Sequence, residues 1–317
     1  MNKKKIIITW WAWFIGSFFL NKYVLLNKDI DFINIDLLTY AWKLDNINTE
    51  VKNSSNYFFE KVDITDFEKL KEIFNKYKPT DIIHFAAESH VDNSIENPFS
   101  FTKTNIIWTQ NLLDCHRIFW LNKFHQISTD EVYWDLQKDE KSFTEENKIN
   151  PSNPYSASKA WADMLVKSYN RTFGIYTIIT RCSNNYWPNQ DDEKLIPRFI
   201  KLLKEDKKVT IHWDWKNIRD WLYVEDHCDA IWLAFNKAKS WSIYNIWWNN
   251  EYNILEMTEI ILKILWKDKS YISFVEDRKW QDKRYAMDAT KIKNELWWYP
   301  KTDFKKWIIE TINHYIK

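Results

Sequence analysis

Short apolar runs alternate with amphipathic helical patterns along most of the chain. Ile6 to Ile8 form a β-branched run, and the apolar residues that follow from Phe14 recur with helical spacing. A second β-like run, Asp31 to Ile35, precedes another helical region. Further strands are predicted at 57–63, 80–87 and 123–128, with helices at 66–77 and 98–119. This alternation predicts an α/β fold of the Rossmann type, a doubly wound parallel sheet.

The segment between the first strand and the first helix has the place of a nucleotide-binding turn but not its residues. In such a turn the backbone adopts conformations that are costly for a residue with a Cβ, and it approaches a pyrophosphate at the helix N-terminus. Glycines are therefore needed. Here Trp10, Trp11 and Trp13 stand in those places, and only Gly16 remains.

Composition explains this contradiction. The chain has 2 Gly and 21 Trp in 317 residues, whereas an average usage of ~7% would give about 22 Gly. Other turn-like segments, such as Tyr186-Trp187-Pro188 and Trp247-Trp248, show the same replacement. We infer that UGA codons were translated as Trp in a gene from an organism that reads UGA as Gly. The alternative is a genuinely tryptophan-rich protein, but paired Trp at tight turns has no steric rationale. Trp221 and Trp298 stand in contexts that suit an aromatic side chain.

With glycine restored, the turn from Thr9 reads T-G-G-A-G-F-I-G, which has the T-G-x-x-G-x-x-G spacing of extended short-chain dehydrogenases/reductases. The second strand ends at Asp36, 20 residues after Gly16. A carboxylate there accepts hydrogen bonds from the adenosine ribose and repels a 2′-phosphate, which favours NAD over NADP. Asp36 could instead be a solvated residue at a strand end, but its spacing favours the cofactor interpretation.

Bulk properties are those of a cytoplasmic enzyme. The length suits one large α/β domain with a smaller one, and a net charge of +1 with a pI near 7.6 argues against a protein that binds nucleic acid or a membrane surface. No apolar run reaches the ~18 residues of a membrane span. Cys115, Cys182 and Cys228 lie far apart with no C-x-x-C, which predicts reduced thiols and no metal site.

The candidate chemistry follows the fifth strand. Thr129-Asp130-Glu131 comes directly after it, and Tyr155 and Lys159 open the next helix at i and i+4, on one face. An ammonium there can lower the phenol's pKa and hold a nicotinamide ribose, and a deprotonated Tyr serves as base in the oxidation of an alcohol. Paired carboxylates after a strand are usually a cap or a solvated loop, and surface Tyr/Lys pairs are common. The two pairs together, in this order along the chain, are a much more specific signal than either pair alone.

Taken together, these motifs make the chain similar to the dTDP-glucose 4,6-dehydratases over residues 6–315. Two departures from the family pattern are Asn93, where Arg is common, and Lys279-Trp280-Gln281, where Pro-Gly-His is usual. The Asp-Glu pair after Thr129 separates this family from the sugar epimerases that resemble it elsewhere. The stretches that carry the resemblance are 35–41, 86–92, 128–133, 155–159, 182–186, 193–197 and 218–224.

The resemblance implies a reaction in three stages. Tyr155, helped by Thr129 and Lys159, takes the C4 hydroxyl proton while hydride passes from C4 to NAD. Glu131 then removes the C5 proton, and Asp130 protonates the departing C6 hydroxyl. Hydride returns to C6, so the enzyme is a lyase that keeps its cofactor.

The resemblance also implies an organisation and a set of contacts. Residues 1–186, with a return segment at 224–247, would bind NAD, and 187–317 would form a smaller α/β domain that binds the substrate, dTDP-glucose. A homodimer is implied, through helix 98–119 and the Tyr155 helix. Arg and Lys suit a diphosphate. The implied cofactor contacts are Trp10, Trp13, Phe14, Ile15, Gly16, Asp36, Leu37, Thr39, Asp63, Ile64, Ala86, Ala87, Thr104, Tyr155, Lys159 and Asn185. The implied substrate contacts are Ser89, Thr129, Asn184, Lys194, Leu195, His212, Arg219, Asn253 and Arg278.

Two alternatives remain open. One is another nucleotide-sugar enzyme of the same superfamily, such as a GDP-mannose or UDP-sugar dehydratase or an epimerase. The other is a nucleotide-binding regulatory protein without turnover. The second is disfavoured because the chain retains Thr129, Asp130, Glu131, Tyr155 and Lys159.

Overall fold

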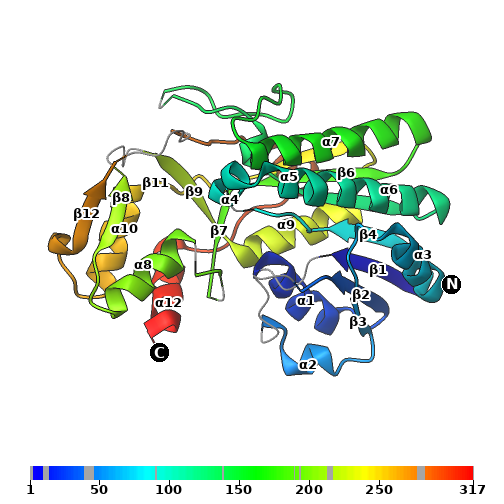
Figure 1. Ribbon diagram of the computed structural model, residues 1–317, viewed down its shortest axis with the longest axis horizontal. Helices are drawn as coiled ribbons and strands as arrows, with labels where there is room; N and C mark the ends of the chain where they lie inside the picture. The colour runs from blue at the N-terminus through cyan, green and yellow to red at the C-terminus, as the bar shows by residue number, and fades with distance from the viewer. Residues whose placement is uncertain are drawn as a thin grey trace.

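A seven-stranded parallel sheet forms the larger part of the computed structural model, which describes residues 3–9, 14–38, 46–89, 91–137, 139–188, 190–192, 194–212, 217–276 and 283–316 (Figure 1). The strand order is β10-β6-β5-β4-β1-β2-β3, which confirms the predicted doubly wound sheet. The order reverses between β1 and β4, where such sheets bind ligands. The strands are β1 (Lys4–Thr9), β2 (Ile30–Asp36), β3 (Tyr57–Lys61), β4 (Asp81–His84), β5 (Lys123–Thr129), β6 (Thr177–Cys182) and β10 (Ser242–Ile246).

Helices cover both faces of this sheet because its strands are apolar on both sides. Successive strand residues point to opposite faces. Ile6 and Ile8 therefore pack in one core with α1 (Phe14–Leu26) and α9 (Val224–Lys237), while Ile7 packs in the other. The helices over that second face are α3 (Phe67–Tyr77), α6 (Trp108–Ile118) and α7 (Pro154–Phe173).

Smaller elements gather around a separate apolar core, on the left of Figure 1. A three-stranded sheet contains β7 (Asn184–Tyr186), β9 (Ile218–Tyr223) and β11 (Glu251–Asn253), and β8 (Val209–His212) pairs with β12 (Ile272–Val275). Three helices pack beside them: α8 (Leu195–Lys204), α10 (Ile254–Ile264) and α12 (Phe304–Ile316). The remaining elements are α2 (Thr49–Lys52), α4 (Val91–Glu96), α5 (Pro98–Phe101), η2 (Thr102–Ile107), η3 (Asp130–Val132), η4 (Lys269–Tyr271) and α11 (Thr290–Leu296).

The helix predicted at 98–119 is not uniform. It contains α5, a π-helical segment η2 and α6. Asn105 of η2 is buried, and its side-chain oxygen accepts from the Glu88 N–H at 2.8 Å. Its amide nitrogen donates to the Glu88 carbonyl at 3.0 Å and to Ser158 Oγ at 2.8 Å. These contacts join the segment after β4 to α7, and they depend on residues far apart in sequence.

Two strand ends also differ from the prediction. The fourth strand, predicted to 87, ends at His84, and the Ala86 N–H donates to Thr9 Oγ1 at 3.2 Å instead of to a neighbouring strand. The third strand, predicted to 63, ends at Lys61, because Asp63 begins a turn in which its carboxylate accepts from the Thr65 N–H at 2.8 Å.

Tryptophan occupies backbone conformations that normally belong to glycine. Within the described ranges, eight non-glycine residues have positive φ, and four of these are Trp120, Trp241, Trp266 and Trp297. For an L-residue this left-handed region costs roughly 1–2 kcal/mol. Trp297 ends α11 at φ 60°, the position where helices favour glycine. Its side chain is 79% exposed, so little packing offsets the strain.

We therefore expect Trp297→Gly to raise the free energy of unfolding by about 1 kcal/mol, since glycine adopts this conformation without steric cost. Urea unfolding of the purified chain would measure it. The matched control is Trp161→Gly, which changes another largely exposed tryptophan, 63% exposed, inside α7. Trp161→Gly should lower the free energy of unfolding by about 1 kcal/mol, because glycine is unfavourable inside a helix. Equal effects at the two positions would contradict the conformational argument.

Candidate active site

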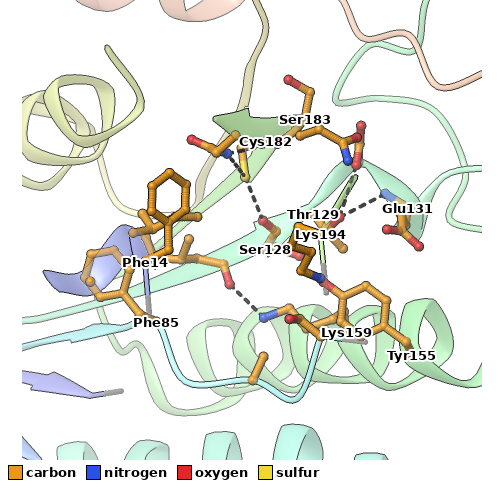
Figure 2. A pocket seen from close by; sticks show the side chains of 18 of the residues that line it. Phe14, Phe85, Ser128, Thr129, Glu131, Tyr155, Lys159, Cys182, Ser183 and Lys194 are labelled. Carbon is orange, nitrogen blue, oxygen red and sulfur yellow. Dashed lines mark hydrogen bonds between the residues drawn. The ribbon is translucent and has the colours of Figure 1, made fainter. Parts of the chain in front are cut away.

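A cavity of about 170 Å³ opens at the carboxyl ends of β1, β4, β5 and β6 (Figure 2). It lies at the edge of the sheet where the strand order reverses, as expected for this fold. Thirteen of the residues predicted from the sequence line it: Phe14, Ile15, Gly16, Ala87, Ser89, Thr129, Asp130, Glu131, Tyr155, Lys159, Asn184, Asn185 and Lys194.

The Asp-Glu pair lies on a tight turn directly after β5. Thr129 caps this 3-10 turn, because its Oγ1 accepts from the Glu131 N–H at 3.3 Å and donates to Asp130 Oδ1 at 3.1 Å. The other Asp130 oxygen, Oδ2, is buried with no hydrogen-bond partner among the described residues. Burial, and then the charge of Glu131, raise the pKa of Asp130 well above its usual range. Burial therefore favours the protonated form of Asp130, which is the form that a general acid needs.

Tyr155 and Lys159 lie on the first turns of α7. A capping box fixes the helix start: the Asn153 side chain accepts from the Ser156 N–H at 2.9 Å, and the Asn153 N–H donates to Ser156 Oγ at 3.1 Å. The spacing places both functional groups in the cavity, as predicted. Figure 2 shows the Lys159 ammonium, which donates to the Ile127 carbonyl at 2.8 Å.

The electrostatics of this pair differ from the prediction. Lys159 was expected to lower the pKa of Tyr155. Instead, burial and the charge of Glu131 raise the pKa of Tyr155 well above its usual value, although the Thr129 hydroxyl opposes this. Burial also lowers the pKa of Lys159 to about 8. Removal from water disfavours both charged forms, and for Tyr155 this effect outweighs any lowering of the pKa by the ammonium.

The other predicted cofactor residues divide into two groups. Asp36, Leu37, Ile64 and Ala86 line a second, much smaller cavity. Asp36 is buried at the end of β2, and its carboxylate accepts from the Leu38 N–H at 2.6 Å. Asp63 and Thr104 do not line either cavity, and the Thr104 hydroxyl donates to the Ser100 carbonyl. Trp10, Trp13 and Thr39 lie outside the described residues.

Trp108 limits the second cavity. Its buried side chain lines this cavity together with Asp36, Ile64 and Ala86, and its indole N–H has no hydrogen-bond partner among the described residues. A buried unpaired N–H costs about 1–3 kcal/mol. The carboxylate at this strand end suits an adenosine ribose, whereas the indole takes up space beside it. The Asp36 carboxylate therefore fits the ribose of NAD, whereas the indole at position 108 does not leave room for it.

Four predicted substrate residues lie away from the cavity lining. Leu195 begins α8 next to Lys194. Arg219 lies in β9 over the ring of Tyr285, and its charge lowers the pKa of Asp130, so its field reaches the site. His212 contacts the Glu276 carbonyl at the end of β8. The Asn253 side chain caps α10 by accepting from the Glu256 N–H at 2.8 Å. Arg278 lies outside the described residues.

Six lining residues were not predicted as site residues: Phe85, Ile127, Ser128, Cys182, Ser183 and Gln190. Five of them stand at the ends of β4, β5 and β6, so their strand-end positions were the available signal. Gln190 carries no such signal, since it lies in a loop after β7.

In the described part of the chain, no group of three or more His, Cys, Asp or Glu side chains could hold a metal ion. Every described helix is too short or too polar to traverse a bilayer.

Comparison with known proteins gives a consistent picture. Residues 7–311 match the family model described as GDP-mannose 4,6 dehydratase. The chain is 42% identical to a dTDP-glucose 4,6-dehydratase of Escherichia coli, over 98% of this chain and 93% of the relative. A dTDP-glucose 4,6-dehydratase of Streptomyces venezuelae, solved with NAD and TYD bound, is 36% identical with a TM-score of 0.94, covering 98% of this chain and 97% of that one. The UDP-glucose 4-epimerase of Thermotoga maritima is 26% identical with a TM-score of 0.90, covering 98% of both.

We expect the side chain at position 108 to decide NAD affinity. In a chain whose Trp10, Trp11 and Trp13 are changed to glycine, the further change Trp108→Gly should strengthen NAD binding about 100-fold. Displacing a buried indole costs about 3 kcal/mol, and each 1.4 kcal/mol is tenfold in affinity. Calorimetric titration with NAD measures the difference. Trp266→Gly in the same background, at an exposed position, is the control and should change nothing. Equal affinity with Trp or Gly at position 108 would contradict this assignment.

Proposed function

This chain belongs to the dTDP-glucose 4,6-dehydratase family, and we propose that it converts dTDP-glucose to dTDP-4-keto-6-deoxyglucose with tightly held NAD. One observation carries the proposal: a buried Asp130, whose pKa is raised, and its neighbour Glu131 share a cavity with Tyr155 and Lys159. Tyr and Lys suffice for alcohol oxidation. Elimination of water also needs an acid and a base.

Each side chain has a distinct task in this reaction. NAD, when bound, accepts hydride from C4 of the sugar and supplies it again at C6. Tyr155 takes the C4 hydroxyl proton as a phenolate, a form that the positive charges of Lys159 and of the bound nicotinamide favour. Glu131 removes the C5 proton, which the new ketone makes acidic, and returns a proton to C5 when hydride reaches C6. Asp130 gives its proton to the departing C6 hydroxyl.

We assign the cofactor to residues 1–186 with the return segment 224–247, and the nucleotide-sugar mainly to 187–317. The position of β10 at the edge of the parallel sheet supports the return segment. Lys194 in the cavity and Arg219 near it supply positive charge for a diphosphate. The remaining predicted contacts belong to the same proposal.

We further propose that most tryptophans of the printed sequence are glycine in the natural protein. Four tryptophans in left-handed backbone conformations support this, as does the unpaired indole of Trp108 at the predicted cofactor site. Trp298 differs from them: it is buried, and its indole N–H donates to the Asp226 carbonyl at 3.3 Å. We therefore keep Trp298 as a true tryptophan. Trp221 is buried in the core of the smaller elements, and its indole N–H, like that of Trp108, has no partner among the described residues. We keep it because its sequence context suits an aromatic side chain.

Native protein should accordingly be lighter than the printed chain by about 19 tryptophan-to-glycine differences, because 21 Trp less the two retained leaves 19. Intact mass spectrometry of the protein from its own host measures this, and peptide mapping assigns each position. Peptides that contain Trp298 serve as the internal control, since they should retain one tryptophan. A native mass equal to that of the printed chain would end the recoding proposal.

We also propose a homodimer, formed through the segment 98–119, which comprises α5, η2 and α6, and through α7. These elements lie next to one another and expose large apolar side chains: Phe99, Ile107 and Met164. Burial of such side chains is the usual driving force for association.

We place the enzyme in the cytoplasm, which agrees with its three free, buried cysteines.

Single substitutions should separate the stages of the reaction in the glycine form, meaning protein from a gene whose UGA codons are replaced by glycine codons. Glu131→Gln should still reduce bound NAD on mixing with dTDP-glucose, but it should abolish incorporation of solvent deuterium at C5. Asp130→Asn should keep that incorporation and slow loss of the C6 hydroxyl. Loss of a general acid or base typically costs 10²–10⁴-fold. Nicotinamide absorbance and mass spectrometry of the sugar give the two readouts.

Tyr155→Phe serves as the contrast, because it should fail before any NADH absorbance develops. Assays with UDP- and GDP-sugars beside dTDP-glucose test the nucleotide specificity. Full turnover with deuterium at C5 in Glu131→Gln would remove the dehydration step from this pair and favour an epimerase.

A further inference from the structure

Hydrogen bonds join four buried polar side chains, here called the buried clamp: Asp163, Arg181, Tyr133 and Asn245. Arg181 Nε contacts Asp163 Oδ2 at 3.0 Å, and both side chains are almost completely excluded from solvent. Arg181 Nη1 donates to the Tyr133 hydroxyl oxygen at 2.7 Å. The same hydroxyl donates to Asn245 Oδ1 at 2.9 Å. None of these four residues lines the cavity.

The clamp joins the two halves of the proposed chemistry. Asp163 follows Lys159 by four residues in α7, so it lies on the helical face that carries Tyr155 and Lys159. At the other end, Tyr133 closes the turn that carries Asp130 and Glu131, and its N–H donates to the Asp130 carbonyl at 3.0 Å. One guanidinium therefore contacts both the helix of the oxidation pair and the turn of the dehydration pair.

Stability alone does not account for this arrangement. A fully buried ion pair is often no more stabilising than apolar residues of the same volume. The Tyr133 ring is already held by stacking on Phe143, with ring centroids 5.0 Å apart. The hydroxyl makes two directional hydrogen bonds, one accepted from Arg181 and one donated to Asn245. These bonds fix the orientation of the turn relative to α7. Catalysis is sensitive to such placement, since an error of about 1 Å can cost about 10²-fold.

We propose that Tyr133 is a positioning residue for the dehydration step: its hydroxyl, held by Arg181 and Asn245, fixes Asp130 and Glu131 relative to the sugar that Tyr155 and Lys159 orient. This inference rests on the dehydratase function proposed above. C4 oxidation uses groups on α7 and Thr129, which β5 holds as its last residue, whereas elimination uses the two carboxylates of the turn itself. Loss of the hydroxyl should therefore affect elimination and leave oxidation unchanged.

The test is Tyr133→Phe in the glycine form, which keeps the ring and removes the hydroxyl. NADH formation on mixing with dTDP-glucose and the KM should match the parent. Solvent deuterium incorporation at C5 and overall kcat should fall together, by about 10–100-fold. Asn245→Ala, which removes the acceptor of the same hydroxyl, should give the same pattern. The matched control is Tyr244→Phe, since Tyr244 is equally buried in the same core and its hydroxyl donates to Glu295 at 2.8 Å. Tyr244→Phe should match the parent in NADH formation, in deuterium incorporation at C5 and in kcat.

Other outcomes overturn the proposal in distinguishable ways. Unchanged kcat in Tyr133→Phe would show that the hydroxyl positions nothing. An equal fall of oxidation and elimination, or a fall matched by Tyr244→Phe, would mean a general structural role. If the parent itself reduces NAD but forms no dehydrated sugar, the proposed function fails, and the inference fails with it. Urea unfolding of all variants identifies any rate loss that follows from unfolded protein.

Discussion

The site depends on removing ionisable groups from water. Asp130, Tyr155 and Lys159 are all buried where the sheet ends, and desolvation is the largest cause of each pKa shift there. Burial favours the neutral form of every one of them. For Asp130 this raises the pKa and favours the form that can donate a proton. For Tyr155 it opposes the phenolate, so positive charge close to the phenol is required for oxidation.

Neighbouring structure holds these groups in place by different means. Thr129 caps the turn after β5, the Asn153 capping box fixes the start of α7, and Asn105 ties the segment after β4 to that helix. The buried clamp adds a contact between turn and helix. Buried polar groups are costly when unpaired and directional when paired. A site built from them has little freedom to shift.

The tryptophans show how a fold can persist with residues that its turns do not suit. At exposed positions such as Trp120 and Trp266 an indole projects into solvent, so the penalty is confined to the backbone conformation. At Trp108 the indole is buried, and the penalty falls on the neighbouring cavity and on an unpaired N–H. Strain at a few turns does not outweigh two apolar cores packed on a parallel sheet. The same substitutions at a binding site have a direct effect on function.

Local patterns in the sequence were sufficient to predict the strands of the parallel sheet and the i, i+4 placement of Tyr155 and Lys159 on one helical face. They also predicted the position of the Asp-Glu pair at a strand end. These features depend on residues a few positions apart, where periodicity and strand-end position carry the information. The π-helical segment at Asn105, the end of β4 at His84 and the contribution of Gln190 to the cavity were decided by tertiary contacts. So was the contact of Tyr133 with Asn245, which lies 112 residues away. The directions in which the pKa values of Asp130, Tyr155 and Lys159 shift were decided there too, because desolvation depends on everything packed around a group and not on its neighbours along the chain.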